Sequence, residues 1–514
     1  MTERWDAIVV GAGHNGLVCA ALLAKAGRRV LVFEANEQVG GAAVTREFAD
    51  GYLVSPVAHL LYQLQPELRR ELGLKLHPAS DDIATIALGD DGRHVRLHGR
   101  GVAGVPAGDA ERYARFRRRM ARFARLMRGW LVRPPPRLGT RDRDDLVALA
   151  RLAFGVRRLG RREMREFLRL IGTNVHDEVT ARFDSRLLKG AVCLDAVLGT
   201  QLGPRSPGTI MSYLYRLAGN DGRTALPRGG IGTVTARLAQ AARAAGATIH
   251  TGRPIERIVV DNGRVVGVET ADGEQFPSYT VISNADPKRT VMKLVGAQHF
   301  ETAFLRRIHH FRSKGNAAKL HLALDGLPAF DGLGRSDLVN RIVIAGDEHR
   351  VERAFNPAKY GEYSPEPVVE MTFPSVSDET LAPAGHHVLS AVVQFAPYGL
   401  RGGWTDEARR AFFDVALGTI AKYAPGIERQ VVASELLTPA DIETQFGITG
   451  GHWHHGELAL DQFLFTRPVS GSAQYAMPLD GLFLCGAGAH PGGGVSGAPG
   501  RNAARSILKR EKAR

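Results

Sequence analysis

The chain has 514 residues, 44% of them apolar and 23% charged, which is the balance of an ordinary globular protein. This length exceeds what one hydrophobic core usually serves, so the sequence predicts at least two lobes. The formal net charge is +14, yet no nucleic-acid-binding module accompanies it. We therefore interpret the excess of arginine as solvated surface and expect no nucleic-acid partner.

Three cysteines lie far apart in the chain, at Cys19, Cys193 and Cys485, with no Cys or His ligand spacing around them. That pattern excludes a disulfide framework and indicates no metal site, and it suits a reducing compartment. No signal peptide precedes the first expected strand, and no apolar run reaches about 18 residues. We therefore expect a cytoplasmic protein without a transmembrane helix.

The N-terminal segment reads as a strand, a glycine-rich turn, a helix and a second strand, which is the order of a βαβ unit. The turn runs from Gly11 to Gly16 with GxGxxG spacing. Its glycines permit a tight turn, a close approach of the backbone to a diphosphate, and close packing of helix on strand. The helix N-terminus faces the anionic phosphates. Glu34 ends the second strand, where a carboxylate accepts hydrogen bonds from ribose hydroxyls, so the unit predicts a dinucleotide site.

A helical and basic stretch extends from about residue 110 to residue 170. Its apolar side chains recur at alternating three- and four-residue steps, which places them on one helix face. They are Tyr113, Phe116, Met120, Phe123, Met127 and Trp130. Arginines occupy the positions between them. We favour a helix that packs this face on the core, and the alternative is a helix that lies on an anionic membrane surface.

The rest of the chain alternates between helices and short apolar strands. A glycine-rich turn at residues 228–232 leads into a helix that ends near residue 245. Expected strands are residues 247–250, 255–260, 265–270, 279–283 and 481–485, and residues 316–324, 368–373 and 388–395 are expected in a second sheet. The sequence from Asp261 to Gly263 predicts a hairpin turn. A second glycine-rich loop, residues 486–494, follows the last strand and precedes a helix over residues 496–509.

These motifs resemble those of one known family. GAGHNGLVCAALLAKAGRRVLVFEANEQVGGAAVT, residues 11–45, resembles the N-terminus of the amine oxidase and phytoene desaturase superfamily of flavoproteins. GLFLCGAGAHPGGGVSGAPGRNAA, residues 481–504, resembles the C-terminal flavin motif of bacterial carotenoid desaturases. The resemblance covers the whole chain, and residues 450–468 look like the phytoene-desaturase-like branch called pyridine nucleotide-disulfide oxidoreductase domain-containing protein 2.

The resemblance implies FAD as cofactor and an α/β fold, in which a Rossmann-like FAD-binding domain of the GR2 type carries an inserted α+β substrate domain. The implied FAD-binding segments are residues 1–75, 216–300 and 440–514, and the implied substrate domain is residues 76–215 and 301–439. A helix N-terminus near the flavin stabilises the negative charge that develops on reduction. The implied cofactor contacts are Gly11, Gly13, His14, Asn15, Gly16, Glu34, Ala35, Gly40, Gly41, Ala42, Ile255, Gly486, Gly488, Gly494, Val495 and Gly497.

Two catalytic candidates follow from the same resemblance. Lys319 stands where amine oxidases of the superfamily carry a lysine that holds a water at flavin N5, and the alternative is an ordinary strand lysine. His490 lies within the second glycine-rich loop, so we expect it near the flavin, where it is either a proton donor or acceptor or simply a packed side chain. For the cluster of His452, His454 and His455 we favour packing over a metal site.

The reaction that we favour removes a hydride and a proton from a small or lipophilic organic substrate and forms a C=C bond. Amine oxidases carry an aromatic residue just after the C-terminal glycine-rich loop, and residues 492–499 contain none. The alternatives are an amine oxidase that forms an imine and hydrogen peroxide, a flavin-dependent isomerase, and a flavin-binding protein without turnover. Oxygen or a membrane quinone is the expected electron acceptor, with a peripheral contact to the inner face of the membrane as a further alternative.

Overall fold

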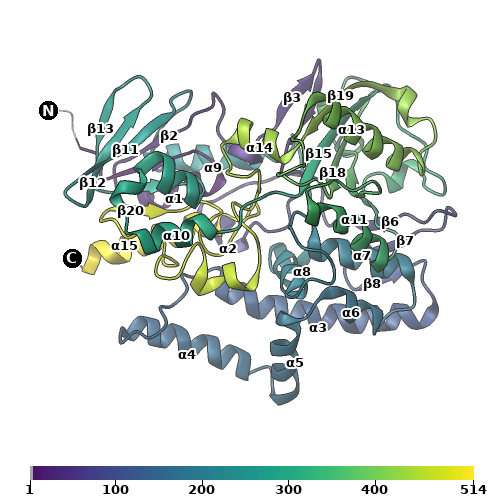
Figure 1. The fold of residues 1–514 in the computed structure, drawn as a ribbon, viewed down its shortest axis with the longest axis horizontal. Coiled ribbons are helices and arrows are strands. Elements are labelled where there is room, and N and C mark those ends of the chain that lie inside the picture. The colour runs from purple at the N-terminus through teal and green to yellow at the C-terminus, as the bar shows by residue number, and fades with distance from the viewer. Residues whose placement is uncertain (1–3, 514) are drawn as a thin grey trace.

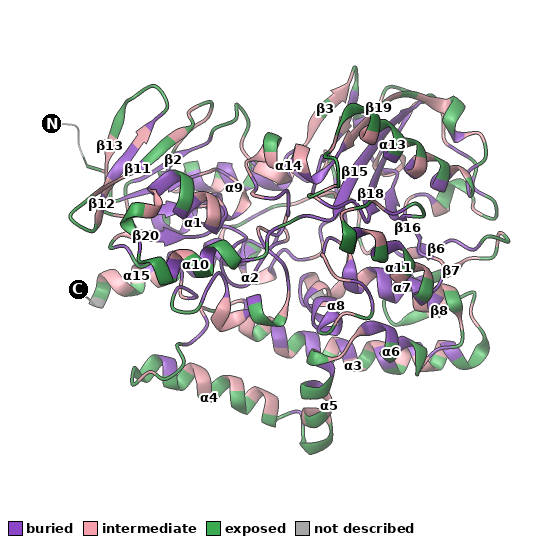
Figure 2. Cartoon of the chain, in the orientation of Figure 1, coloured by how far each residue is buried: buried purple, intermediate pink, exposed green. Residues whose placement is uncertain are grey.

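The computed structural model describes residues 4–513 and has two lobes (Figure 1). Elements from both ends of the chain, coloured purple and yellow, build the lobe that carries both termini. Green strands from the middle of the chain build the other lobe, and a group of blue helices lies below both. Buried side chains fill the strands of both lobes, whereas the lowest helices are mostly exposed (Figure 2).

A five-stranded parallel sheet joins four distant parts of the sequence in the first lobe. Its order is β10-β2-β1-β14-β20. The strands are β1 (Ala7–Val10), β2 (Val30–Phe33), β10 (Thr248–His250), β14 (Val281–Ser283) and β20 (Leu482–Leu484). Residues of β1 and β2 are buried throughout, as expected of strands covered on both faces. The first and the last predicted strands therefore belong to one sheet.

Helices and a small antiparallel sheet complete this lobe. Helix α1 (His14–Lys25) packs against α9 (Gly232–Ala244) and α15 (Ala498–Ala513). Strands β11 (Ile255–Asp261), β12 (Arg264–Thr270) and β13 (Gln275–Pro277) form the small sheet. The predicted hairpin joins β11 to β12, and both Asn262 and Gly263 have positive φ, as a type I′ turn requires.

The second lobe is built on an eight-stranded sheet with the order β19-β15-β18-β17-β16-β6-β7-β8. Its strands are β6 (Thr85–Ala87), β7 (Val95–His98), β8 (Gly101–Ala103), β15 (Ala317–Leu324), β16 (Arg341–Ile344), β17 (Val368–Thr372), β18 (His387–Gln394) and β19 (Val431–Leu437). The three strands predicted for a second sheet, β15, β17 and β18, are neighbours in it. All pairs are antiparallel except β16 with β6.

The helical part consists of α3 (Ala107–Leu131), α4 (Arg143–Arg157), α5 (Arg161–Gly172), α6 (Val175–Thr180), α7 (Arg186–Val197) and α8 (Thr209–Leu217). The apolar face of α3 is buried in the core of this part: Tyr113, Phe116, Met120, Phe123 and Met127 are each at most 3% exposed. The helix therefore packs its apolar face on the core, which is the alternative that the sequence analysis favours. No helix within residues 4–513 is long and apolar enough to cross a bilayer.

The architecture confirms the predicted α/β fold with a Rossmann-like sheet and an inserted mixed lobe. Every strand of the parallel sheet falls within residues 1–75, 216–300 and 440–514, and every strand of the eight-stranded sheet falls outside them. We therefore keep those boundaries as our proposal for the domains.

Candidate active site

The glycine-rich turn after β1 begins the site. Gly11 has φ +98°, a left-handed conformation that glycine adopts without strain. Helix α1 then begins at His14, and no side chain caps its first N–H groups. Gly13, His14 and Asn15 at this N-terminus line the cavity, and a helix N-terminus of this kind suits an anion.

The glycines of the turn have different roles. A Cβ atom at Gly16 would overlap the carbonyl oxygen of Gly11, so Gly16 lets α1 fold back on the turn. A Cβ atom at Gly13 would lie 2.7 Å from Nδ2 of Asn284, a residue that follows β14. Gly41 faces Gly13 across the turn, with its Cβ position 3.6 Å from the Cα atom of Gly13. At Gly13 and Gly41 the turn therefore presents backbone atoms without side chains.

Glu34 lies at the end of β2 and borders the same cavity. It is 6% exposed, and its carboxylate accepts hydrogen bonds from the backbone N–H groups of Ala12 at 2.8 Å and Asn36 at 3.1 Å. Burial raises the pKa of Glu34, while these N–H donors oppose that shift. Glu34 lines the cavity together with Ala35 and Ile255, and its binding of a ribose stays a prediction.

The C-terminal glycine-rich loop meets the first turn. Ala487, Gly494 and Val495 line the cavity, and Nε2 of His14 lies 3.0 Å from the carbonyl oxygen of Gly494. Gly486, Gly488 and Gly497 lie behind this surface, since Cβ atoms there would overlap Asn284, Pro287 and Leu68 respectively. These three glycines allow close packing of the loop on its neighbours.

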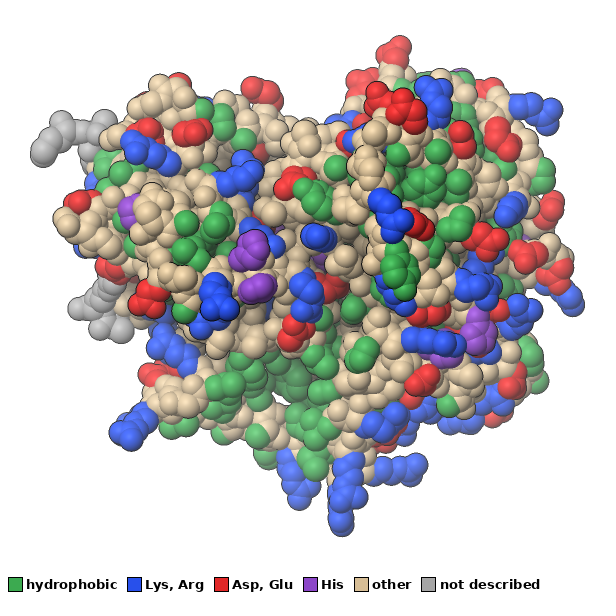
Figure 3. Space-filling view, viewed as in Figure 1, with side chains coloured by type: hydrophobic (Ala, Val, Ile, Leu, Met, Phe, Trp, Pro, Cys, Tyr) green, Lys and Arg blue, Asp and Glu red, His purple; other side chains and the backbone are tan. Residues whose placement is uncertain are grey.

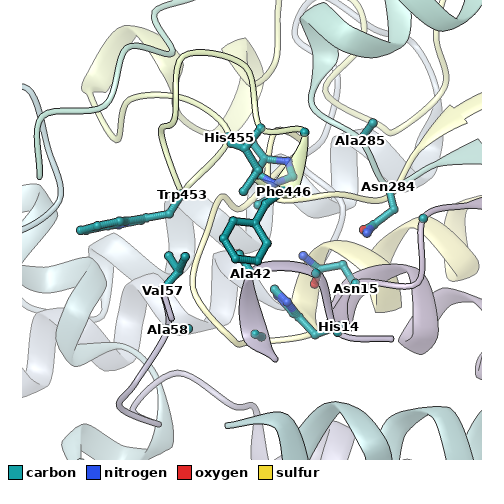
Figure 4. A pocket seen from close by; sticks show the side chains of 18 of the residues that line it. His14, Asn15, Ala42, Val57, Ala58, Asn284, Ala285, Phe446, Trp453 and His455 are labelled. Carbon is teal, nitrogen blue, oxygen red and sulfur yellow. The ribbon is translucent and has the colours of Figure 1, made fainter. Parts of the chain in front are cut away.

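One cavity of about 550 Å³ connects these features. Figure 4 shows His14 and Asn15 at one side of it, Phe446 near its middle, and Val57 and Trp453 at the other side. The predicted residues that line it are Gly11, Gly13, His14, Asn15, Glu34, Ala35, Gly40, Gly41, Ala42, Ile255, Gly494 and Val495. The aromatic lining comes from Phe33, Tyr62, Phe446 and Trp453, all of them outside residues 492–499.

A buried polar cluster that sequence analysis missed forms one wall of the cavity. His59, Glu370 and Arg216 line this wall. Nε2 of His59 is buried and lies 3.3 Å from Oε1 of Glu370. Glu370 pairs with Arg216 at 3.3 Å and with Arg341. These cations keep the pKa of Glu370 well below its usual range despite burial, and burial lowers the pKa of His59 to about 4.

Lys319 lies behind this wall rather than on it. The side chain is fully buried in β15, and Nζ lies 3.1 Å from Nδ1 of His59 and 3.0 Å from Oγ of Ser390. Burial lowers the pKa of Lys319 to about 7, although Glu370 opposes the shift. The predicted lysine therefore reaches the cavity only through His59, which is the residue that lines it.

His490 lies apart from the cavity. It is fully buried, its Nε2 atom lies 3.2 Å from the carbonyl oxygen of Trp130, and burial lowers its pKa to about 4. Its own carbonyl oxygen accepts a hydrogen bond from the hydroxyl of Tyr475. The ring thus joins the C-terminal loop to α3, and we do not retain His490 as a proton-transfer residue.

The histidine cluster contributes residues to the cavity wall. Trp453, His454 and His455 line the cavity, while His452 lies 3.6 Å from Glu457. Throughout residues 4–513, no group of three or more His, Cys, Asp or Glu side chains is placed to hold a metal ion.

Arg467 holds the histidine segment against the C-terminal loop. Its guanidinium is completely buried and donates hydrogen bonds to the carbonyl oxygens of His454 at 2.8 Å, Glu457 at 3.0 Å and Ala487 at 2.9 Å. Burial lowers the pKa of Arg467 to about 10. The residue is therefore a positioning residue for one wall of the cavity.

The site suits the FAD that the sequence predicts. The uncapped N–H groups of α1 and the bare backbone at Gly13 and Gly41 match the needs of a diphosphate. Oδ1 of Asn15 is buried without a hydrogen-bond partner among residues 4–513, and Asn15 lines the cavity. Glu34 offers a carboxylate acceptor of the kind that ribose hydroxyls bind.

Comparisons with known proteins agree with this geometry. The model of the family described as flavin containing amine oxidoreductase matches residues 16–508. Mouse pyridine nucleotide-disulfide oxidoreductase domain-containing protein 2 is 34% identical, over 99% of this chain and 94% of its own length. A limonene dehydrogenase subunit of Castellaniella defragrans is 27% identical, over 99% and 95% of the two chains. The fold matches a structure of putrescine oxidase bound to putrescine with a TM-score of 0.61, at 16% identity and with full coverage of both chains.

Proposed function

The chain belongs to the family of flavin containing amine oxidoreductases and is an FAD-dependent oxidoreductase, and we propose that it dehydrogenates a carbon–carbon bond of a small lipophilic substrate. The observation that carries this proposal is the composition of the cavity beyond the glycine loops. Its apolar lining comes from Val57, Leu60, Leu198, Val392 and Trp453. The similarity to a limonene dehydrogenase subunit supports a hydrocarbon-like substrate.

We propose that both glycine-rich segments hold the cofactor. The N-terminus of α1 and the backbone at Gly13 bind the diphosphate, Glu34 binds the adenosine ribose, and Gly494 and Val495 lie against the flavin. When bound, FAD supplies the two-electron acceptor that takes the hydride from the substrate. Gly486, Gly488 and Gly497 contribute indirectly, because they let this loop pack closely enough to reach the site.

His59 is the residue that we assign to the proton. His59 lines the cavity, its Nε2 atom is buried beside Glu370, and the pKa of about 4 keeps the ring neutral near pH 7. The nearby carboxylate of Glu370 stabilises a proton that reaches Nε2. Nδ1 can then pass its own proton to the neutral form of Lys319, 3.1 Å away. Lys319 is thus a positioning residue and proton store, while His59 touches the substrate.

Anaerobic addition of substrate to the purified holoenzyme tests the proposal. A panel of limonene, longer polyenes in detergent, and aliphatic amines would be mixed with the protein while flavin absorbance is recorded. Bleaching by a hydrocarbon, together with a desaturated product, is the expected result. H59Q should slow the bleaching at least tenfold with FAD content unchanged. Bleaching by amines alone would reject the assignment.

Amine oxidation is the second candidate, and two observations favour it. Aromatic side chains of Phe446 and Trp453 line the cavity, and a buried lysine lies within 3.1 Å of a lining residue. An amine oxidase would release an aldehyde and hydrogen peroxide from an amine in air. Reoxidation of the reduced protein by oxygen and by a soluble quinone, measured side by side, identifies the electron acceptor in either case.

A further inference from the structure

The helices α4 and α5 project from the lower side of the molecule and present an apolar and basic outer face (Figures 1 and 3). Five of the large apolar side chains most exposed to solvent belong to residues 138–168, and they are between 46% and 64% exposed. They are Leu138, Leu146, Val147, Phe154 and Leu168. Helix α4 contains no buried apolar side chain, although most of its 15 residues are Leu, Val, Ala or Phe. We call these five residues and the arginines between them the α4–α5 surface.

The two kinds of side chain share the outer face of α4. At 100° per residue, Leu146, Val147 and Phe154 fall within one arc of about 100°. The exposed residues Arg143, Arg151, Arg157 and Arg158 fall within or beside the same arc. The opposite side holds the half-buried Leu149, Leu152 and Val156. The outer face therefore has an apolar centre with arginines around it.

Each acidic side chain of α4 and α5 has a polar partner, and the exposed Asp144 pairs with Lys509 at 2.5 Å. Glu163 pairs with Arg119 of α3 at 3.0 Å, and Glu166 pairs with Arg169 at 2.8 Å. Asp145 is buried and accepts a hydrogen bond from Gln474. Arg161, Arg162 and Arg165 remain exposed on α5. The charge that faces solvent is thus strongly positive.

From this arrangement we infer that the α4–α5 surface docks on an anionic phospholipid bilayer, with Phe154 and its apolar neighbours entering the interface between headgroups and acyl chains. Apolar side chains ringed by arginines match that boundary, which offers hydrocarbon below a layer of phosphate. A nucleic acid would match the charge but not the apolar centre. A second copy of this chain would oppose arginines with arginines across a symmetric contact.

Vesicle flotation of the FAD-loaded full-length protein tests this inference. Vesicles of phosphatidylcholine alone would be compared with vesicles that contain about one third phosphatidylglycerol, at low and high salt. The wild type should float with the anionic vesicles at least tenfold more than with the neutral ones, and high salt should reduce the fraction. The triple variant L146S/V147S/F154S should lose this binding, and R151Q/R157Q/R158Q should lose the preference for anionic lipid.

Matched controls and a second readout separate docking from misfolding. Y360S and V432S remove exposed apolar side chains outside the α4–α5 surface, and both variants should float like the wild type. F154W should shift its fluorescence to shorter wavelength on anionic vesicles, because the ring leaves water. Wild type that stays unbound at low salt overturns the inference. A dimer in solution that the serine variant dissociates, without any vesicle binding, would assign the surface to a second copy instead.

Discussion

Nε2 of His14 lies 3.0 Å from the carbonyl oxygen of Gly494, and this contact joins the first glycine-rich turn to the last across 480 residues of chain. Both residues line the cavity. Burial lowers the pKa of His14 to about 4, so near pH 7 the neutral ring donates one hydrogen bond, and Gly494 accepts it. The contact fixes the spacing between the two loops that we assign to FAD.

We expect His14→Leu to weaken FAD binding by about 1 kcal/mol, or about fivefold, because one buried hydrogen bond is lost and a carbonyl oxygen remains unsatisfied. His14→Gln keeps a donor and should lose less. The measurement is the dissociation constant of FAD by fluorescence quenching of the apoprotein. Equal affinities for wild type and the leucine variant would mean that the loops are held apart by other contacts.

Two helical glycines make a matched pair for testing the turn. Gly16→Ala places a Cβ atom against the carbonyl oxygen of Gly11, which is backbone and cannot move aside. We expect at least a hundredfold loss of FAD affinity. Gly418→Ala lies in α13 (Asp406–Ala421), where a Cβ atom meets nothing within 4 Å, and should raise stability by up to about 1 kcal/mol with FAD binding intact. A G16A variant that is purified with full FAD content would contradict this assignment.

Acid should destabilise the fold because several buried histidines are neutral. Burial lowers the pKa of His14, His59, His455 and His490 to about 4. Between the ordinary value of 6.5 and about 4, the unfolded chain takes up protons that the folded chain does not. The unfolding free energy is therefore greatest above pH 6.5 and falls as the pH is lowered toward 4, by up to about 1.4 kcal/mol per pH unit for each such histidine.

Urea unfolding at pH 7.5, 6 and 5 measures this dependence, with FAD at a fixed saturating concentration. His490→Asn removes one of these titrating rings and keeps a side chain able to form a hydrogen bond, so the variant should show a shallower loss of stability than wild type between pH 6.5 and 5. Parallel curves for the two proteins would show that His490 does not stay neutral in the folded chain.

Sequence motifs identified the cofactor loops because their chemistry is local. The glycines at 11, 13 and 16 act through backbone geometry within one turn, which spacing records directly. No motif of this kind marks the polar wall of His59, Arg216 and Glu370, because each of these residues comes from a different part of the chain. One signal was present: Lys319 and Glu370 are charged residues inside mostly apolar strands, AAKLHLAL and VVEMT. A charge at such a position requires a buried partner.

The position of His490 shows where prediction from a motif fails. Its place in the C-terminal loop predicted contact with the flavin, yet the ring turns toward α3 and lies 3.2 Å from the carbonyl oxygen of Trp130. Neighbouring Gly494 and Val495 do line the cavity. Proximity in sequence does not give side-chain direction in an irregular loop, where no periodicity constrains it.

Arg467 should be among the most costly residues to replace. Its buried guanidinium donates to the backbone carbonyl oxygens of His454, Glu457 and Ala487. Arg467→Met keeps volume but leaves those carbonyl groups without a donor, so we expect a loss of about 3 to 5 kcal/mol. Arg467→Lys should recover part of it. Thermal unfolding with FAD present gives the comparison, and a loss below about 1 kcal/mol would show that water replaces the guanidinium.

The last prediction concerns the pH dependence that Lys319 gives to stability. The pKa of this lysine falls from 10.5 to about 7 because the side chain is buried. Between those values the unfolded chain binds a proton that the folded chain does not, so wild-type unfolding free energy rises with pH over that range. Lys319→Met removes the titration. The stability of the variant relative to wild type should therefore be most favourable below pH 7, and should decline by up to about 1.4 kcal/mol per unit as the pH rises toward 10. Lys75→Met, at an exposed position, is the control and should follow wild type at every pH. A constant difference between K319M and wild type from pH 6.5 to 9.5 would mean that Lys319 keeps its proton in the folded chain, and the proton store behind His59 would then be lost from the proposed mechanism.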